Sequence, residues 1–164
     1  MEIEELQTDS ETSLHGQHLI FSLGKEKYAF PITKIQEIMG VFPVTPIPNT
    51  NDYIKGVINL RGKIIAVVDL RARLQMPDRA YDERTCFIVV TVPLSGQLVS
   101  LAVVVDHVEE VVEFESRQLE APADFGYSLV SQFVTAVGKT ESHGDDAITL
   151  LDIDKLVLEG MTVA

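Results

Sequence analysis

Two short sequence patterns occur twice, in the same order, along this chain of 164 residues. The pattern I-x-x-I-x-E-I at residues 32–38 returns as V-x-x-V-x-E-V at residues 105–111, and IAVVDL at residues 65–70 returns as ITLLDI at residues 148–153. Such repeats indicate duplication of one structural unit, although strands rich in valine and isoleucine also resemble one another by chance. We therefore expect two similar lobes of about 70 residues, which share a buried interface because each is small for an independent domain.

Strand signals dominate the rest of the sequence. Three segments rich in β-branched and aromatic residues contain central turns and are expected to be β-hairpins: residues 18–32, 57–70 and 86–105. Prolines confine residues 43–48 (PVTPIP) to an extended connection or an edge strand. Helical candidates are short: residues 51–55, 70–74, 123–133 and 154–159. These features predict a mainly all-β fold of barrel-like lobes, with short helices in the connections and at the C-terminus.

The net charge of −12 is unevenly distributed. Residues 1–16 carry five acids and no base, and their polar, aperiodic sequence predicts a disordered N-terminal tail. Residues 17–84, the expected first lobe, carry seven acids and ten bases, whereas residues 85–164 carry thirteen acids and three bases; the second lobe is expected over residues 85–160. This balance disfavours nucleic-acid binding, which needs clustered Lys and Arg. It also suggests that the two lobes meet different partners.

Several classes of function find no support in the residues. Cys86 is the single cysteine, so no disulfide framework exists, and no apolar stretch approaches a membrane span. The acidic N-terminus does not resemble a signal peptide. The sequence contains no zinc-ligand spacing, Gly-x-Gly-x-x-Gly motif or P-loop. We expect a cytoplasmic protein that is not an enzyme and that uses no metal or cofactor.

Candidate binding residues are more informative. Ile32, Ile35 and Ile38 recur every third residue, and they fit either the core or a groove that receives a partner's helix. Arg61 stands beside the glycine of a tight turn, where it is either simply solvated or able to offer a planar fork to a carboxylate. The position that corresponds to Arg61 in the second copy is interpreted as Val137, so the fold itself does not demand arginine there.

Three stretches resemble the CheW family of chemotaxis coupling proteins: QEI at residues 36–38, IKGVINLRGKIIAVVDLR at residues 54–71, and VVDHVEEV at residues 104–111. The resemblance spans about residues 17–160. It implies two five-stranded, SH3-like barrel subdomains around a shared hydrophobic interface. It also implies an adaptor that joins the cytoplasmic tips of methyl-accepting chemoreceptors to the histidine kinase CheA, in arrays at the membrane but without insertion into it.

The resemblance also implies binding residues. Ile32, Ile35, Ile38 and Val111 match the family's receptor-binding groove, and Glu37 and Arg61 match polar positions at or beside it that could form an ion pair. Phe42, Val44 and Gly56 fall in the region used against the kinase's regulatory domain. The sequence departs from the family's pattern in the loop TESHGDDA at residues 140–147 and at His107 and Glu109, which leaves the choice of receptor open.

The CheW signature also occurs in CheA and CheV. No kinase region or receiver domain accompanies it in this sequence, so we expect a stand-alone adaptor. An adaptor of the same fold in a related pathway, such as pilus motility, is one alternative. A small β-barrel that binds a small molecule or a nucleic acid is another, of a different class.

Overall fold

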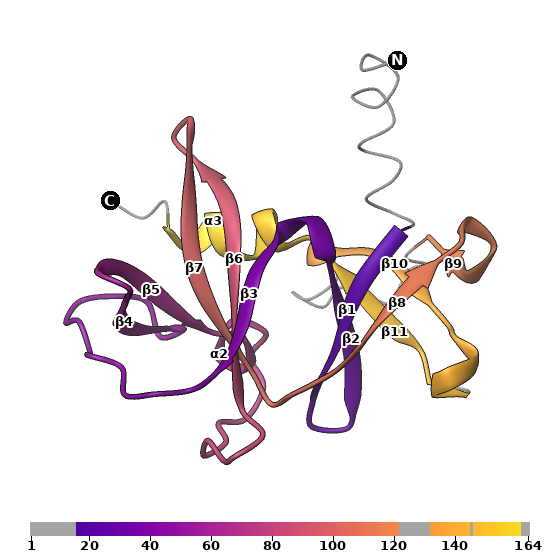
Figure 1. The fold of residues 1–164 in the computed structure, drawn as a ribbon, viewed down its shortest axis with the longest axis horizontal. Helices are drawn as coiled ribbons and strands as arrows, with labels where there is room; N and C mark the ends of the chain where they lie inside the picture. Colours follow the sequence, from indigo (N-terminus) through magenta and orange to yellow (C-terminus); the bar gives the residue numbers. More distant parts are fainter. Residues whose placement is uncertain (1–15, 122–131, 145, 162–164) are drawn as a thin grey trace.

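The computed structural model describes residues 16–121, 132–144 and 146–161 (Figure 1). The expected tail, apart from Gly16, and the helical candidate at residues 123–133, apart from its last two residues, lie outside this range. Two β-sheets make up the molecule, and they lie side by side in Figure 1. The prediction of a mainly all-β fold is confirmed.

The first sheet has five strands in the order β3-β6-β7-β5-β4. Their bounds are Ile35–Gly40 (β3), Cys86–Leu94 (β6), Gln97–Val105 (β7), Lys63–Asp69 (β5) and Ile54–Leu60 (β4). An isolated bridge connects its two edges, because Thr45, just after β3, exchanges two backbone hydrogen bonds of 2.9 Å with Val57 in β4. The sheet is therefore curled into a barrel-like unit.

The second sheet has the strand order β8-β1-β2-β11-β10-β9. Its bounds are His107–Phe114 (β8), Gly16–Leu23 (β1), Glu26–Pro31 (β2), Ile148–Leu151 (β11), Val134–Gly138 (β10) and Leu119–Glu120 (β9). Among the described elements, 3₁₀ turns lie at Ile32–Lys34 (η1), Ser116–Gln118 (η2) and Glu141–His143 (η4). Without the two-residue β9, this sheet also has five strands.

The three predicted hairpins are present as β1–β2, β4–β5 and β6–β7. Two of the predicted helices are also present, as Leu70–Arg73 (α2) and Ile153–Met161 (α3). The helix expected at residues 51–55 is wrong. A turn closed by the Ile54 N–H on the Asn51 carbonyl leads directly into β4, where Ile54 pairs with Val68. Pairing with β5 outweighs the local preference of this short segment.

The repeat is confirmed by the strand pairing. The parallel pair β5–β7 places Val67 opposite Ala102, and the parallel pair β11–β2 places Leu150 opposite Ala29 at the corresponding position. An aspartate at the end of β5 and another just after β11 each accept a backbone N–H of the following helix. Under this correspondence β1 and β2 match β6 and β7, β3 matches β8, and β4 and β5 match β10 and β11.

The expected lobe boundary at residue 84 does not divide the two sheets. Residues 35–105 form the first sheet, whereas the second sheet combines residues 16–31 with residues 107–151. The hairpin of each copy thus pairs with the later strands of the other copy. The physical reason lies in the connections: neither residues 32–34 nor Asp106 supplies the glycine or asparagine that a tight hairpin would favour, and the chain crosses to the other sheet instead.

The largest core lies between the two sheets and includes Phe21, Phe30, Leu70, Leu101 and Phe133, all at most 1% exposed. Each sheet also encloses a smaller core, one around Phe87 and Val89 in the first sheet and one around Ile20 and Phe114 in the second. Because the shared core contains strands from both sheets, the expected buried interface is confirmed.

Candidate binding surfaces

A β-bulge in β3 places the threefold-spaced isoleucines on one side of the strand. Ile35 pairs with Val90 and Ile38 pairs with Ile88, and Gln36 is the extra residue between the shifted registers. Val90 and Ile88 both belong to the core between the sheets. A bulge adds one residue to a strand, so side chains three positions apart can face the same way. Ile32, in the turn η1, packs against this core as well.

Strand β8 repeats this arrangement on the second sheet. Val108 pairs with Phe21 and Val111 pairs with Leu19, and Glu109 is the bulged residue. Strands β3 and β8 are the first strands in their sheets' orders, and each presents one exposed apolar side chain: Ile38 is 41% exposed and Val111 is 48% exposed. Ile32, Ile35 and Val108 are partly buried. We call Ile32, Ile35, Ile38 and Val111 the edge-strand residues.

Arg61 and Glu37 form the ion pair that the sequence suggested. The guanidinium donates two hydrogen bonds to the carboxylate, with Nη1–Oε2 at 2.6 Å and Nη2–Oε1 at 2.7 Å. Arg61 and Gly62 both have positive φ, 52° and 87°, at the turn of the β4–β5 hairpin, as a type I′ turn requires. The hydrogen bond from Arg61, followed by its charge, lowers the pKa of Glu37.

This ion pair does not lie among the edge-strand residues. Glu37 pairs with Val89, which faces the core inside the first sheet, whereas Ile38 pairs with Ile88 on the opposite face. The structure thus does not bring the six expected groove residues to one face: Glu37, which binds Arg61, lies on the face of β3 opposite to Ile35 and Ile38. The interpretation of Val137 as the counterpart of Arg61 is also wrong: Val137 pairs with Thr149 as Val57 pairs with Ala66, so Val137 corresponds to Val57.

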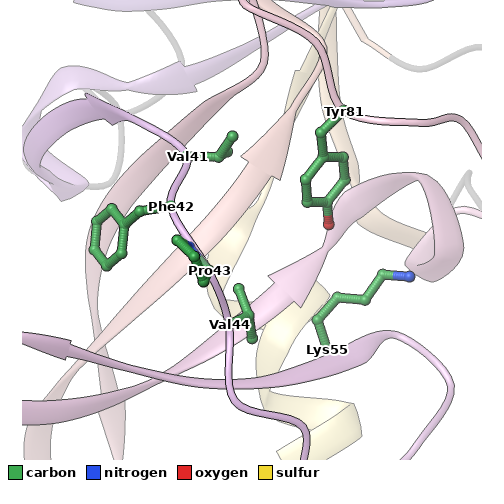
Figure 2. A pocket seen from close by; sticks show the side chains of 6 residues that line it. All are labelled: Val41, Phe42, Pro43, Val44, Lys55 and Tyr81. Carbon is green, nitrogen blue, oxygen red and sulfur yellow. The ribbon is translucent and has the colours of Figure 1, made fainter.

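A pocket of about 430 Å³ opens beside the segment that follows β3 (Figure 2). Val41, Phe42, Pro43 and Val44 form one wall, and Lys55 and Tyr81 lie on the other side in Figure 2. Phe42 is 38% exposed and packs edge-on against Phe87, with ring centroids 5.3 Å apart. The two expected kinase-facing side chains, Phe42 and Val44, therefore line one apolar pocket.

The polar ends of Tyr81 and Lys55 are both directed at Asp69. The Tyr81 hydroxyl donates to Asp69 Oδ2 at 3.4 Å, and Lys55 Nζ lies 3.6 Å from the same oxygen. Burial, and secondarily the nearby Asp69 carboxylate, raises the pKa of Tyr81. Sequence reasoning missed Tyr81, because it lies in a polar loop without periodicity and only tertiary packing brings it to the pocket.

Gly56 is buried and does not line the pocket. Its φ is 145°, and a Cβ at this position would lie 2.0 Å from the backbone oxygen of Thr45. Glycine therefore allows the segment after β3 to approach β4 and to make the Thr45–Val57 bridge. Gly56 supports the segment that carries Phe42 and Val44, and its expected part in kinase binding stays a prediction.

The described residues offer little for other kinds of chemistry. They contain no cluster of three potential metal-ligating side chains. None of the helices in this part of the chain is both long and apolar enough to cross a membrane. Burial raises the pKa of the Cys86 thiol, which is the opposite of what an activated nucleophile needs.

Most of the chain is similar to known proteins. A family model described as a CheW-like domain matches residues 17–160. Chemotaxis protein CheW of Klebsiella aerogenes is 40% identical over 141 residues, which cover 86% of this chain and 81% of that protein. Chemotaxis protein CheW of Rhizobium meliloti is 29% identical over 142 residues, covering 86% and 87% of the two chains.

The fold has a solved counterpart as well. The crystal structure of the scaffolding protein TtCheW from Thermoanaerobacter tengcongensis matches with a TM-score of 0.74 and 31% sequence identity. The match covers 87% of this chain and 92% of that one. Sequence and fold agree over nearly the full length, and the chain belongs to the CheW-like family of chemotaxis scaffold proteins.

Proposed function

We propose that this protein is a non-enzymatic adaptor that couples methyl-accepting chemoreceptors to the histidine kinase CheA in the cytoplasm. The observation that carries the proposal is the presence of two separate sets of partly exposed apolar side chains on one body with a shared core. The edge-strand residues are one set, and the lining of the pocket at Phe42 is the other. An adaptor needs two faces whose relative position is fixed, and the core between the sheets can fix it.

The edge-strand residues suit the receptor. Ile38 and Val111 are exposed apolar side chains on edge strands, and partly buried aliphatic side chains lie beside them. A helix presents apolar side chains three and four residues apart, which suits a surface of this kind. In our proposal the cytoplasmic tip of the receptor, a helical structure, binds here.

The pocket at Phe42 suits the kinase's regulatory domain. Its lining is mainly apolar, and the polar ends of Lys55 and Tyr81 are turned to Asp69. An apolar side chain of the partner therefore fits better than a charged one. With both partners bound, receptor changes would bias the kinase through contacts that differ between its states, without chemistry in the adaptor.

The test uses one variant of the edge-strand residues and two variants of the pocket. Ile38→Asp places a charge on an exposed side chain of β3 and is expected to abolish binding to a receptor-tip fragment while binding to the CheA regulatory domain persists. Tyr81→Ala and Phe42→Ala are expected to weaken only the kinase interaction, by about tenfold or more for a central apolar contact. Affinities are measured by calorimetry with purified partners.

Ile64→Asp is the matched control. Ile64 is 61% exposed and belongs to neither surface, so this variant should bind both partners normally. Ile35→Asp is unsuitable because Ile35 packs against the core. If the unmodified protein binds neither partner at high micromolar concentration, the adaptor proposal fails. Normal binding of both partners by Ile38→Asp and Phe42→Ala would refute the assignment of the surfaces.

A further inference from the structure

The duplicated fold gives Glu37 a counterpart in the second sheet. Glu37 pairs with Val89 directly after the bulge in β3, and Glu110 pairs with Ile20 directly after the bulge in β8. Val89 and Ile20 each belong to the core enclosed by their own sheet. Glu37 and Glu110 therefore occupy equivalent places on equivalent strands.

Each of these glutamates faces a base from the last hairpin of its sheet. Arg61, in the turn between β4 and β5, holds Glu37. His143, in the turn η4 between β10 and β11, lies near Glu110, with Nδ1 3.5 Å from Oε2. This turn belongs to the loop at residues 140–147, where the sequence is expected to depart from the family's pattern. The longer loop of the second sheet thus brings a histidine to the place where the first sheet has an arginine.

His143 lies in a largely enclosed polar site. Its side chain is 7% exposed, and its Nε2 is 3.6 Å from Glu109 Oε1. Within its own loop, Nδ1 lies 3.0 Å from Thr140 Oγ1 and 3.1 Å from Ser142 Oγ. Two carboxylates of β8 therefore face the imidazole, one toward each ring nitrogen.

The other charged groups around this site come from several elements. Lys27 of β2 forms an ion pair with Glu109, and His107 of β8 also acts on Glu109. Glu141 belongs to η4, and Asp146 donates its backbone N–H to the His143 carbonyl. Glu113, Glu115, Arg117 and Lys139 line a pocket together with Thr140, Ser142 and Gly144. Burial acts to raise the pKa of Glu109, but the hydrogen bond and charge of Lys27 outweigh it, so the pKa is lowered. Glu109 therefore stays ionised across the range in which histidine takes up a proton.

We propose that His143 is a proton-dependent latch that holds the β10–β11 loop onto β8, at the place where Arg61 holds the β4–β5 turn permanently. Arginine stays charged at all physiological pH values, whereas histidine gains its charge between about pH 8 and pH 5. The imidazolium is attracted to Glu109 and Glu110, and the neutral ring loses most of that attraction. The latch is closed in mild acid and loosened in mild alkali.

The latch contacts β8, the strand that also carries Val111, one of the edge-strand residues. Because Val111 follows Glu110 directly, a more ordered β8 near Glu110 also holds Val111 in place. This consequence for receptor binding rests on the proposed function, whereas the latch itself does not. An experiment that measures only the order of the loop therefore tests the latch independently of the proposed function.

The experiment is amide hydrogen exchange of the full chain at about pH 5.5 and about pH 8, expressed as protection factors so that the intrinsic effect of pH on exchange is removed. The backbone N–H groups of His143 and Gly144 donate within the loop, to the carbonyls of Thr140 and Glu141, and report on its order. In the unmodified protein we expect protection to be about threefold higher in acid, the scale of a partly exposed ion pair.

Two variants and a control make the outcome decisive. His143→Gln should show, at both pH values, the lower protection that the unmodified protein has at about pH 8. His143→Arg should show, at both pH values, the higher protection that the unmodified protein has at about pH 5.5. His107→Gln, which changes another histidine near Glu109, should keep the pH dependence of the unmodified protein. If His143→Gln keeps the pH dependence, or if the unmodified protein shows none, the latch does not exist.

Discussion

At the scale of single residues, Gly56 decides how closely the segment after β3 approaches β4. Its φ of 145° and the 2.0 Å that would separate an added Cβ from the Thr45 oxygen leave no room for a side chain, and the obstacle is backbone. The second sheet has Ala136 at the equivalent place, opposite Leu150 as Gly56 is opposite Val67. The demand for glycine therefore comes from the Thr45 contact and not from the strand pairing.

Gly56→Ala is expected to lower the free energy of unfolding by about 3 kcal/mol, because the strained backbone must shift and the Thr45–Val57 bridge breaks. Denaturant unfolding followed by circular dichroism measures this loss. Gly40→Ala is the control: nothing lies within 4 Å of its added Cβ, and a change within about 1 kcal/mol is expected. Equal losses in both variants would contradict the close approach as the cause.

The role of a single residue can be predicted from the sequence where both its chemistry and its neighbours in the sequence indicate the same role. Arg61 beside a turn glycine is a carboxylate-binding candidate from the sequence, and it does bind Glu37. The threefold spacing of the isoleucines is visible too, but its cause, the extra residue Gln36, is not, since bulges have no distinct sequence signal here. Tyr81 could not be predicted, because its position depends on Asp69 and on a loop that only the folded chain defines.

At the scale of the elements, Asp106 at the crossing from β7 to β8 contacts three other parts of the molecule. Its carboxylate accepts the Gly24 N–H at 2.7 Å, two guanidinium nitrogens of Arg71, the shortest at 2.6 Å, and Arg79 Nη1 at 2.8 Å. Gly24 belongs to the β1–β2 turn, Arg71 to α2, and Arg79 to the loop that carries Tyr81. One side chain therefore connects the two sheets and supports a wall of the pocket.

Asp106→Asn is expected to cost about 2 kcal/mol of unfolding free energy near neutral pH, since charge-assisted hydrogen bonds become neutral ones. Burial acts to raise the pKa of Asp106, but the hydrogen bonds from Arg71, Gly24 and Arg79 outweigh it, so the folded-state pKa is lowered. The contribution is therefore complete above the unfolded-state value of about 4 and is lost as the pH falls through the folded-state value.

Urea unfolding at several pH values measures this effect. The difference between the unmodified protein and Asp106→Asn should be constant near neutrality and shrink below about pH 4. Asp52→Asn, at an exposed position, should show little difference at any pH. A difference between the unmodified protein and Asp106→Asn that stays the same at about pH 3 and at about pH 6 would show that the carboxylate charge is not responsible.

Elements are easier to predict than their arrangement. Each hairpin combines two β-branched segments with a local turn, such as the one at Arg61 and Gly62, and such signals are contained in a few residues. The crossings after Pro31 and after Val105 depend on which sheet offers a free edge, and that choice involves residues far away in the sequence. Local patterns therefore identify the repeat, but they do not show that its two copies exchange hairpins.

At the scale of the whole molecule, each sheet contains the hairpin of the other sequence copy, and this changes which charged residues belong to each sheet. The difference in charge between the two units nevertheless remains. Residues 35–105, which form the first sheet, carry six acids and seven bases, whereas residues 16–34 and 106–164 together carry fourteen acids and six bases. Lys25, Lys27 and Lys34 thus belong with the acidic strands. A nearly neutral unit and an acidic unit can still favour different partners, with a strength that falls as salt rises.

The exchange of hairpins between the two sheets also predicts how the protein behaves when its chain is cleaved between the two sequence copies. A break between Arg84 and Thr85 separates the two sequence copies, but it leaves strands of both sheets in each fragment: β2 loses β11, β3 loses β6, and β5 loses β7. Each fragment then retains isolated hairpins, which are marginal in water, and the shared core is split. Neither residues 1–84 nor residues 85–164 should fold alone.

Mixed in equal amounts, the two fragments should form a 1:1 complex with the circular dichroism spectrum of the intact protein, since every strand regains its partners. Sedimentation measures the stoichiometry, and dispersed amide resonances report folding. Two contiguous lobes would behave in the opposite way, because each fragment would then contain a complete sheet. A folded monomer of residues 1–84 would therefore refute the exchange of hairpins. Folding that occurs only after mixing is the expected result, because each copy supplies strands that complete the other copy's sheet.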